Sequence, residues 1–164
     1  MDERMKLLAT FILCLFVSGT AHGDEAAQCR ANGGTYLTGK VIKGPTFARG
    51  HPRDGVELSH THLKLLSDRR RAVYDVAIDN VFAAGYNAAG ESVPAPLSTI
   101  RTGDRLEICG KLFTHGGRGI DWVHTNCGGR PSKAQPDGWL KVVGREGTPG
   151  PNLESSQEYC QLWH

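Results

Sequence analysis

Two histidines stand two residues apart in SHTHLK, and a third follows in the segment GRGIDWVHTNCGG. His60 and His62 have the spacing i, i+2, which on a strand places both imidazoles on one face, where both can bind one metal ion. Asp121 and His124 are the candidate partners further along the chain, with Asp79 as another carboxylate within reach. These side chains suggest a metal-dependent hydrolase with a divalent metal cofactor, in which His60, His62, Asp121 and His124 form the candidate metal site. A polar strand face and a buried core histidine are the simpler interpretations.

Basic side chains form a second candidate site. Lys64 shares the strand face of the two histidines, and the turn SDRRR that follows contains Arg69, Arg70 and Arg71. Guanidinium groups bind phosphate and carboxylate groups, although arginines in a turn can also be simply solvated. The leading hypothesis is therefore a binding module without a cofactor, not an enzyme, whose ligand is an anionic polymer, a glycan or an envelope protein. Its predicted binding residues are His60, His62, Lys64, Arg69, Arg70, Arg71 and His124.

A third alternative is a structural envelope protein that has no small ligand. The chain contains no His-Glu-x-x-His, Gly-x-Ser-x-Gly or phosphate-loop motif, so no common catalytic motif supports an enzyme. The formal net charge of +2 is too small to predict a nucleic-acid partner.

Short alternating apolar runs, separated by turns rich in glycine and charged residues, predict a mostly β domain with few helices. The predicted strands are residues 35–44, 58–66, 72–78, 105–113, 120–127 and 139–144. Residues 58–66 and 72–78 form a predicted hairpin with the three arginines at its tip. A meander of five to six strands hides its edges in a small barrel, and the strand count favours the oligonucleotide/oligosaccharide-binding (OB) barrel. A β-sandwich is the alternative architecture.

The first 23 residues resemble a signal peptide. An apolar run follows Lys6, and Ala21 and Gly23 supply the small residues needed for cleavage after Gly23. The apolar run is short for a membrane span. We expect an exported, secreted or periplasmic monomer without a transmembrane segment after cleavage. Residues 24–164 would form one domain, with an irregular tail from about residue 145.

Four cysteines remain after cleavage, an even number that predicts two disulfides in an exported protein. If the glycine-rich turn is centred on Arg118, strand pairing places Cys109 opposite Cys127. The predicted disulfides are therefore Cys109–Cys127 and Cys29–Cys160. The same register predicts that Trp122 fills the core with His124 half-buried beside it. It places Asp121 on the opposite face, unless a bulge breaks the alternation.

Three segments, GDRLEICGKLF, IDWVHTN and PDGWLK, resemble a family of small exported bacterial proteins of unknown function. The family pattern is Gly-Asp, then a His-Trp-Thr-His run, then Asp-Gly-Trp, and the match is best from Thr102 to Lys141. The matching positions are Gly103, Asp104, Gly110, Trp122, His124, Pro136, Asp137, Gly138 and Trp139. Asp121, Thr125 and Asn126 depart from the family run, and Ile78 replaces a family histidine. The resemblance implies a small exported barrel and implies no activity.

Overall fold

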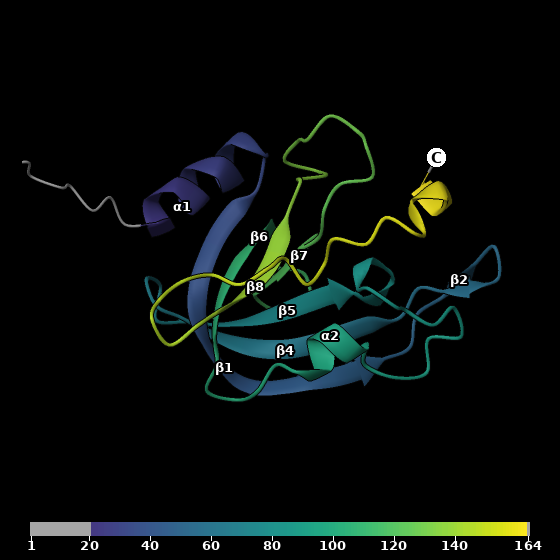
Figure 1. Ribbon diagram of the computed structural model, residues 1–164, viewed down its shortest axis with the longest axis horizontal. Coiled ribbons are helices and arrows are strands. Elements are labelled where there is room, and N and C mark those ends of the chain that lie inside the picture. Colours follow the sequence, from purple (N-terminus) through teal and green to yellow (C-terminus); the bar gives the residue numbers. More distant parts are fainter. Residues whose placement is uncertain (1–20, 164) are drawn as a thin grey trace, which may run out of the picture.

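The computed structural model describes residues 21–163 of the chain (Figure 1). The predicted signal segment therefore lies outside the described residues except for its last three. The first element is the helix α1 (Ala21–Ala31), which the sequence pattern did not indicate. No helix within residues 21–163 is long and apolar enough to cross a membrane. Most of the regular structure is β, as predicted.

The main sheet has six strands whose order closes into a nearly complete ring. They are β1 (Thr35–Ala48), β4 (His60–Ser67), β5 (Val73–Asp79), β6 (Arg105–Phe113), β7 (Gly119–Asp121) and β8 (Trp139–Val143). The order is β1-β4-β5-β7-β6-β8, and β1 also pairs with β6, so five strands form the ring and β8 extends it. β5 and β7 are parallel, and the other pairs are antiparallel.

Short elements complete the chain. They are the hairpin of β2 (Pro52–Arg53) and β3 (Val56–Glu57), the turns η1 (Asn80–Phe82) and η2 (Cys160–Trp163), and the helix α2 (Ala95–Ser98). Figure 1 places α1 and the C-terminal η2 at opposite ends of the view, so the two ends of the molecule can carry separate sites.

β1 is the longest strand because it belongs to both sides of the ring. Its residues 35–40 pair with β6, and its residues 39–48 pair with β4. A Cβ atom on Gly39, where the two pairings overlap, would lie 2.4 Å from the carbonyl oxygen of Leu66, so only glycine allows this close approach. The bulges of β1 lie further along the strand, after Val41 and Lys43.

The core lies inside the ring and follows the alternation expected of strands with one buried face. Thr61, Leu63 and Leu65 of β4 point inward and are at most 2% exposed. Tyr74, Val76 and Ile78 of β5 do the same. The predicted β4–β5 hairpin and its inward faces are therefore confirmed, and His60, His62 and Lys64 point outward.

Two disulfides are present, but the predicted pairs are wrong. Cys29 pairs with Cys109, and Cys127 pairs with Cys160. Leu112 lies opposite Ile120, so the β6–β7 turn is centred on Gly116, two residues earlier than predicted. β7 ends at Asp121, and Cys109 lies opposite Trp139 of β8 instead of opposite Cys127.

Candidate functional site

The outer face of β4 and β5 carries basic and acidic side chains that pair across the strands. His62 Nδ1 lies 3.1 Å from Asp75 Oδ2, and Lys64 Nζ lies 3.3 Å from Asp75 Oδ1. His60 lies opposite Asp79 in the strand register. Each basic side chain of β4 therefore has a carboxylate on β5, and this face offers an anion little unpaired positive charge.

His60 and His124 both approach the carboxylate of Asp79, at the end of β5. Nε2 of His60 lies 2.8 Å from Asp79 Oδ1, and Nε2 of His124 lies 3.6 Å from Asp79 Oδ2. The next residue, Asn80, is fully buried, and its side-chain oxygen accepts a 2.6 Å hydrogen bond from Thr61 Oγ1. This buried bond holds the end of β5 against the start of β4, and so keeps Asp79 beside His60.

The imidazole of His124 is buried and fixed in orientation. Its ring stacks on Phe82 with centroids 3.6 Å apart and planes 4° apart, and it is 3% exposed. Nδ1 lies 2.9 Å from the carbonyl oxygen of Thr125. Because a carbonyl can only accept, Nδ1 carries the proton in the neutral ring, and the lone pair of Nε2 faces Asp79.

The pKa values of the two imidazoles that share Asp79 are shifted in opposite directions. Burial lowers the pKa of His124, because the charged imidazolium loses its hydration. The hydrogen bond to Asp79 raises the pKa of the half-exposed His60. One carboxylate thus lies between a ring that favours the neutral form and a ring that favours the charged form.

Two further carboxyl groups lie near Asp79. Asp121 ends β7, and burial raises its pKa, with a smaller contribution from the charge of Asp79. Glu154, from the C-terminal tail, is completely buried, and neither of its carboxyl oxygens makes a hydrogen bond within residues 21–163. Burial first, and Asp79 second, raise the pKa of Glu154 well above its usual range, which favours its neutral form. Sequence analysis did not identify Glu154, because the tail lacks a periodic pattern.

Asp121 and His124 come near the same carboxylate because β7 stops between them. Trp122 has a φ of 52°, in the left-handed region that bulky residues rarely adopt. The alternation breaks there, so Val123 enters the core and is fully buried, while Trp122 stays partly exposed. The prediction that Trp122 fills the core is therefore wrong, and the broken alternation removes the reason for placing Asp121 and His124 on opposite faces.

An aromatic pocket of about 130 Å³ lies on one side of His124. Its lining includes Phe82, Trp122, His124, Asn126, Gln135 and Trp163. The rings of Phe82 and Trp163 lie 5.2 Å apart, and those of Trp122 and His124 also lie 5.2 Å apart. The pocket combines aromatic faces with two amide side chains, which can donate and accept hydrogen bonds.

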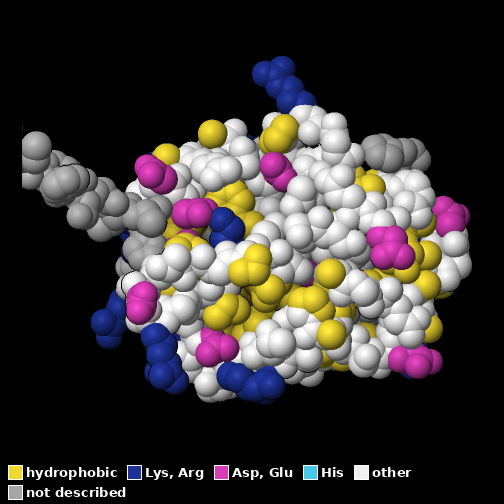
Figure 2. Space-filling model, viewed as in Figure 1, with side chains coloured by type: hydrophobic (Ala, Val, Ile, Leu, Met, Phe, Trp, Pro, Cys, Tyr) yellow, Lys and Arg dark blue, Asp and Glu magenta, His cyan; other side chains and the backbone are white. Residues whose placement is uncertain are grey.

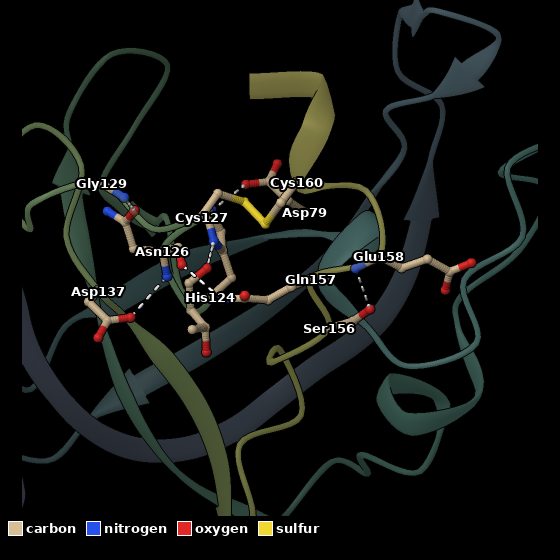
Figure 3. Close-up of a disulfide and its surroundings, with 11 residues drawn as sticks. Asp79, His124, Asn126, Cys127, Gly129, Asp137, Ser156, Gln157, Glu158 and Cys160 are labelled. Atoms are coloured by element: carbon tan, nitrogen blue, oxygen red, sulfur yellow. Dashed lines mark hydrogen bonds and ion pairs between the residues drawn. A yellow bond between two sulfur atoms is a disulfide. The ribbon is translucent and has the colours of Figure 1, made fainter. Parts of the chain in front are cut away.

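The Cys127–Cys160 disulfide fastens the C-terminal turn to this pocket. Figure 3 shows the disulfide with His124 and Asp79 among the residues around it. The loop after His124 is held by Asp137, whose Oδ1 accepts a 2.9 Å hydrogen bond from the backbone N–H of Asn126 (Figure 3). Cys160 begins the turn that carries Trp163, so the disulfide positions one wall of the pocket.

The other predicted site residues lie elsewhere. Arg69, Arg70 and Arg71 are exposed in the β4–β5 turn, at the opposite end of β4 from His60. At about 3.3 Å per residue, the eight residues of β4 separate the two places by roughly 25 Å. Within residues 21–163, no group of three or more His, Cys, Asp or Glu side chains is arranged to hold a metal ion. The structure brings His60, Asp121 and His124 to Asp79, and His62 to Asp75.

No protein-family model matches the chain, and no curated protein matches it. The resemblance seen between Thr102 and Lys141 therefore stays a prediction. The site must be interpreted from its own geometry.

Proposed function

We propose that this protein is an exported binding module that holds one ring of a polyhydroxylated ligand, such as a glycan, in the aromatic pocket. The observation that carries the proposal is the pocket itself: aromatic side chains from three separate segments, Phe82, Trp122 and Trp163, surround a hollow with amide groups at its edge. Pockets that enclose a whole drug-sized ligand measure about 300–1,000 Å³. A volume of about 130 Å³ suits a single ring or end group of a larger ligand.

The chemistry of the pocket suits a sugar ring. The C–H face of a pyranose is apolar and packs against aromatic faces, while its hydroxyl groups need hydrogen-bond partners at the ring edge. Asn126 and Gln135 supply such partners inside the pocket. His60 and Asp79 extend the polar surface beyond His124.

An OB-like barrel is the architecture that we propose for the ring of strands. The order β1-β4-β5-β7-β6, with closure through β1–β6 and a parallel β5–β7 pair, supports it. In OB barrels the second and third strands and the adjoining loops bind oligonucleotides and oligosaccharides. β4 and β5 occupy that place in the order, and the cluster around Asp79 lies at one end of them.

Two disulfides are consistent with an oxidising, extracytoplasmic location. With the signal-like segment at residues 1–23, they support a secreted or periplasmic protein. Mass spectrometry of the exported protein, with a mature chain beginning at Asp24, is the direct check.

Tryptophan fluorescence offers the test of ligand binding, since Trp122 and Trp163 line the pocket. Titration with N-acetylglucosamine tetramer, cellotetraose and polygalacturonate should change the emission with at least one of these probes. Trp163→Ala and Gln135→Ala should weaken binding about tenfold, the effect of losing roughly 1.4 kcal/mol. Gln28→Ala, an exposed change on α1, is the matched control and should bind normally.

Absence of binding to all three probes would contradict the glycan proposal and favour a structural protein without a small ligand. Equal binding by the wild type and both pocket variants would place any glycan site elsewhere. Thermal melting of each variant shows whether a loss of binding is a loss of folding.

A second function, hydrolysis by acid–base catalysis, is favoured by one observation. Asp79 lies between a His124 whose pKa is lowered and a His60 whose pKa is raised. Paired groups with opposite shifts are typical of an acid and a base in one site. Incubation with the same oligosaccharides, with and without added zinc or manganese, should then release products that His60→Gln abolishes, and an intact substrate would exclude this reaction.

A further inference from the structure

A second and larger hollow lies at the opposite end of the molecule from the aromatic pocket. It measures about 680 Å³ and lies between α1, the β4–β5 turn and the loop after β8. Four arginines from four different segments line it: Arg30, Arg69, Arg105 and Arg145. Lys and Arg side chains also gather at the lower left of the view in Figure 2, the end at which Figure 1 draws the N-terminus of α1.

Most of the positive charge of this cavity is unpaired. Arg105 pairs with Asp68, with Nη2 at 2.6 Å from Oδ2. Within residues 21–163, Arg30, Arg69 and Arg145 form no ion pair. Three guanidinium groups around one hollow attract an anion, because a guanidinium donates paired hydrogen bonds to a carboxylate or a phosphate.

The α1 wall of the cavity is fixed to the sheet. Cys29 in α1 is bonded to Cys109 in β6, which sets the position of the neighbouring Arg30. Lys141 of β8 also binds Glu25 of α1, with Nζ 2.9 Å from both carboxylate oxygens. A site held by a disulfide and an ion pair is preorganised, so less ordering is needed when a ligand binds.

One wall residue, Tyr36, is uncharged. Burial, with the charge of Glu107, raises the pKa of Tyr36 far above the neutral range. The phenol therefore keeps its proton, and its partner is the carboxylate of Glu107, which also lines the cavity. The partly exposed Val143 adds an apolar surface to the lining, which suits the carbon skeleton of an organic ligand.

We propose that this cavity binds a small organic anion that carries a carboxylate or phosphate group, with Arg30, Arg69 and Arg145 as its charged contacts. A volume of about 680 Å³ is within the range of sites that enclose a whole small molecule. The proposal is independent of the glycan pocket. It also separates Arg69 from Arg70 and Arg71, which do not line the cavity.

Isothermal titration calorimetry at low salt tests the site with citrate, inorganic phosphate, glucuronate and glucose 6-phosphate, and with glucose as the neutral comparison. At least one anion should bind with one-to-one stoichiometry, and glucose should not. Arg69→Gln and Arg145→Gln should each weaken that binding about tenfold or more, because each variant loses a charge-assisted hydrogen bond to the anion. The carboxylate and phosphate probes together show which anionic group is preferred.

Arg70→Gln is the matched control, since it removes the same charge from the same exposed turn outside the cavity. It should change the dissociation constant less than twofold, and Trp163→Ala should leave anion binding unchanged. If no anion binds, or if Arg70→Gln weakens binding as much as Arg69→Gln, the proposal is wrong. The second result would mean that anion affinity depends only on the net charge of the β4–β5 turn and not on contacts inside the cavity.

Discussion

At the scale of single residues, Asp79 influences the pKa of both imidazoles in the candidate site. It raises the pKa of His60 through a hydrogen bond, and its charge partly offsets the effect of burial on His124. The folded-state pKa of His60 lies above its unfolded value of 6.5. The stability that the pair contributes is therefore fully present below pH 6.5, and it is lost as the pH rises through the folded-state pKa.

The variant Asp79→Asn should lower the pKa of both His60 and His124, because the amide removes the negative charge that favours each imidazolium. Nuclear magnetic resonance titration of the two rings is the measurement. Both side chains of the His60–Asp79 pair are partly exposed, so the loss of stability should stay under about 1 kcal/mol. That loss should be larger at pH 5.5 than at pH 8.5.

The matched control is Asp75→Asn, which removes a carboxylate paired with His62 from the same face of β5. It should leave the titrations of His60 and His124 unchanged. If the titration midpoints of His60 and His124 are unaltered in Asp79→Asn, the carboxylate does not influence the pKa of either ring. The acid–base hypothesis would then lose its basis.

At the scale of elements, β1 and β7 decide the shape of the ring in different ways. β1 bends between two partners at Gly39, whereas β7 stops after three residues because Trp122 leaves the extended conformation. The left-handed backbone conformation of Trp122 is uncommon for a bulky residue. Strained backbone conformations of this kind are often found at functional sites. This conformation places the aromatic ring of Trp122 at the pocket and the side chain of Val123 in the core.

Gly39→Ala should destabilise the protein by more than about 1 kcal/mol, because the new methyl group would approach the backbone of Leu66 to 2.4 Å. Chemical denaturation gives the free energy of unfolding. Gly144→Ala is the control, since its nearest new contact, with the oxygen of Thr148, is an ordinary 3.5 Å. Equal effects of the two substitutions would show that the contact at Gly39 relaxes without cost.

At the scale of the whole molecule, local periodicity could predict most of the long strands but not how distant segments meet, and the strand predicted at residues 120–127 ends at Asp121. The β4–β5 hairpin follows from alternation alone, and with it the outward direction of His60 and His62. The disulfides depend on where one turn is centred, and a shift from Arg118 to Gly116 separates Cys127 from Cys109. Glu154 could not be predicted, because tertiary packing of an irregular tail places it beside Asp79.

The disulfides also fasten α1 to β6 and the C-terminal turn to the loop after β7, and their removal should have unequal effects. Cys29–Cys109 joins residues 80 positions apart, and Cys127–Cys160 joins residues 33 apart. In the chain-entropy model these loops correspond to about 4.5 and 3.7 kcal/mol of stability. The Cys29 and Cys109 side chains are also fully buried, so replacing this pair with alanine adds the loss of core packing.

Chemical denaturation should therefore find the double variant Cys29→Ala/Cys109→Ala less stable than Cys127→Ala/Cys160→Ala. The second variant should keep more of its stability yet lose glycan-dependent fluorescence changes, because the turn that carries Trp163 is released from the pocket. Non-reducing peptide mapping of the wild type should yield the Cys29–Cys109 and Cys127–Cys160 peptides. Other cysteine pairs in the peptide map would contradict this role of the Cys127–Cys160 disulfide in holding Trp163 at the aromatic pocket. An undiminished fluorescence response in the variant that lacks this disulfide would contradict it as well.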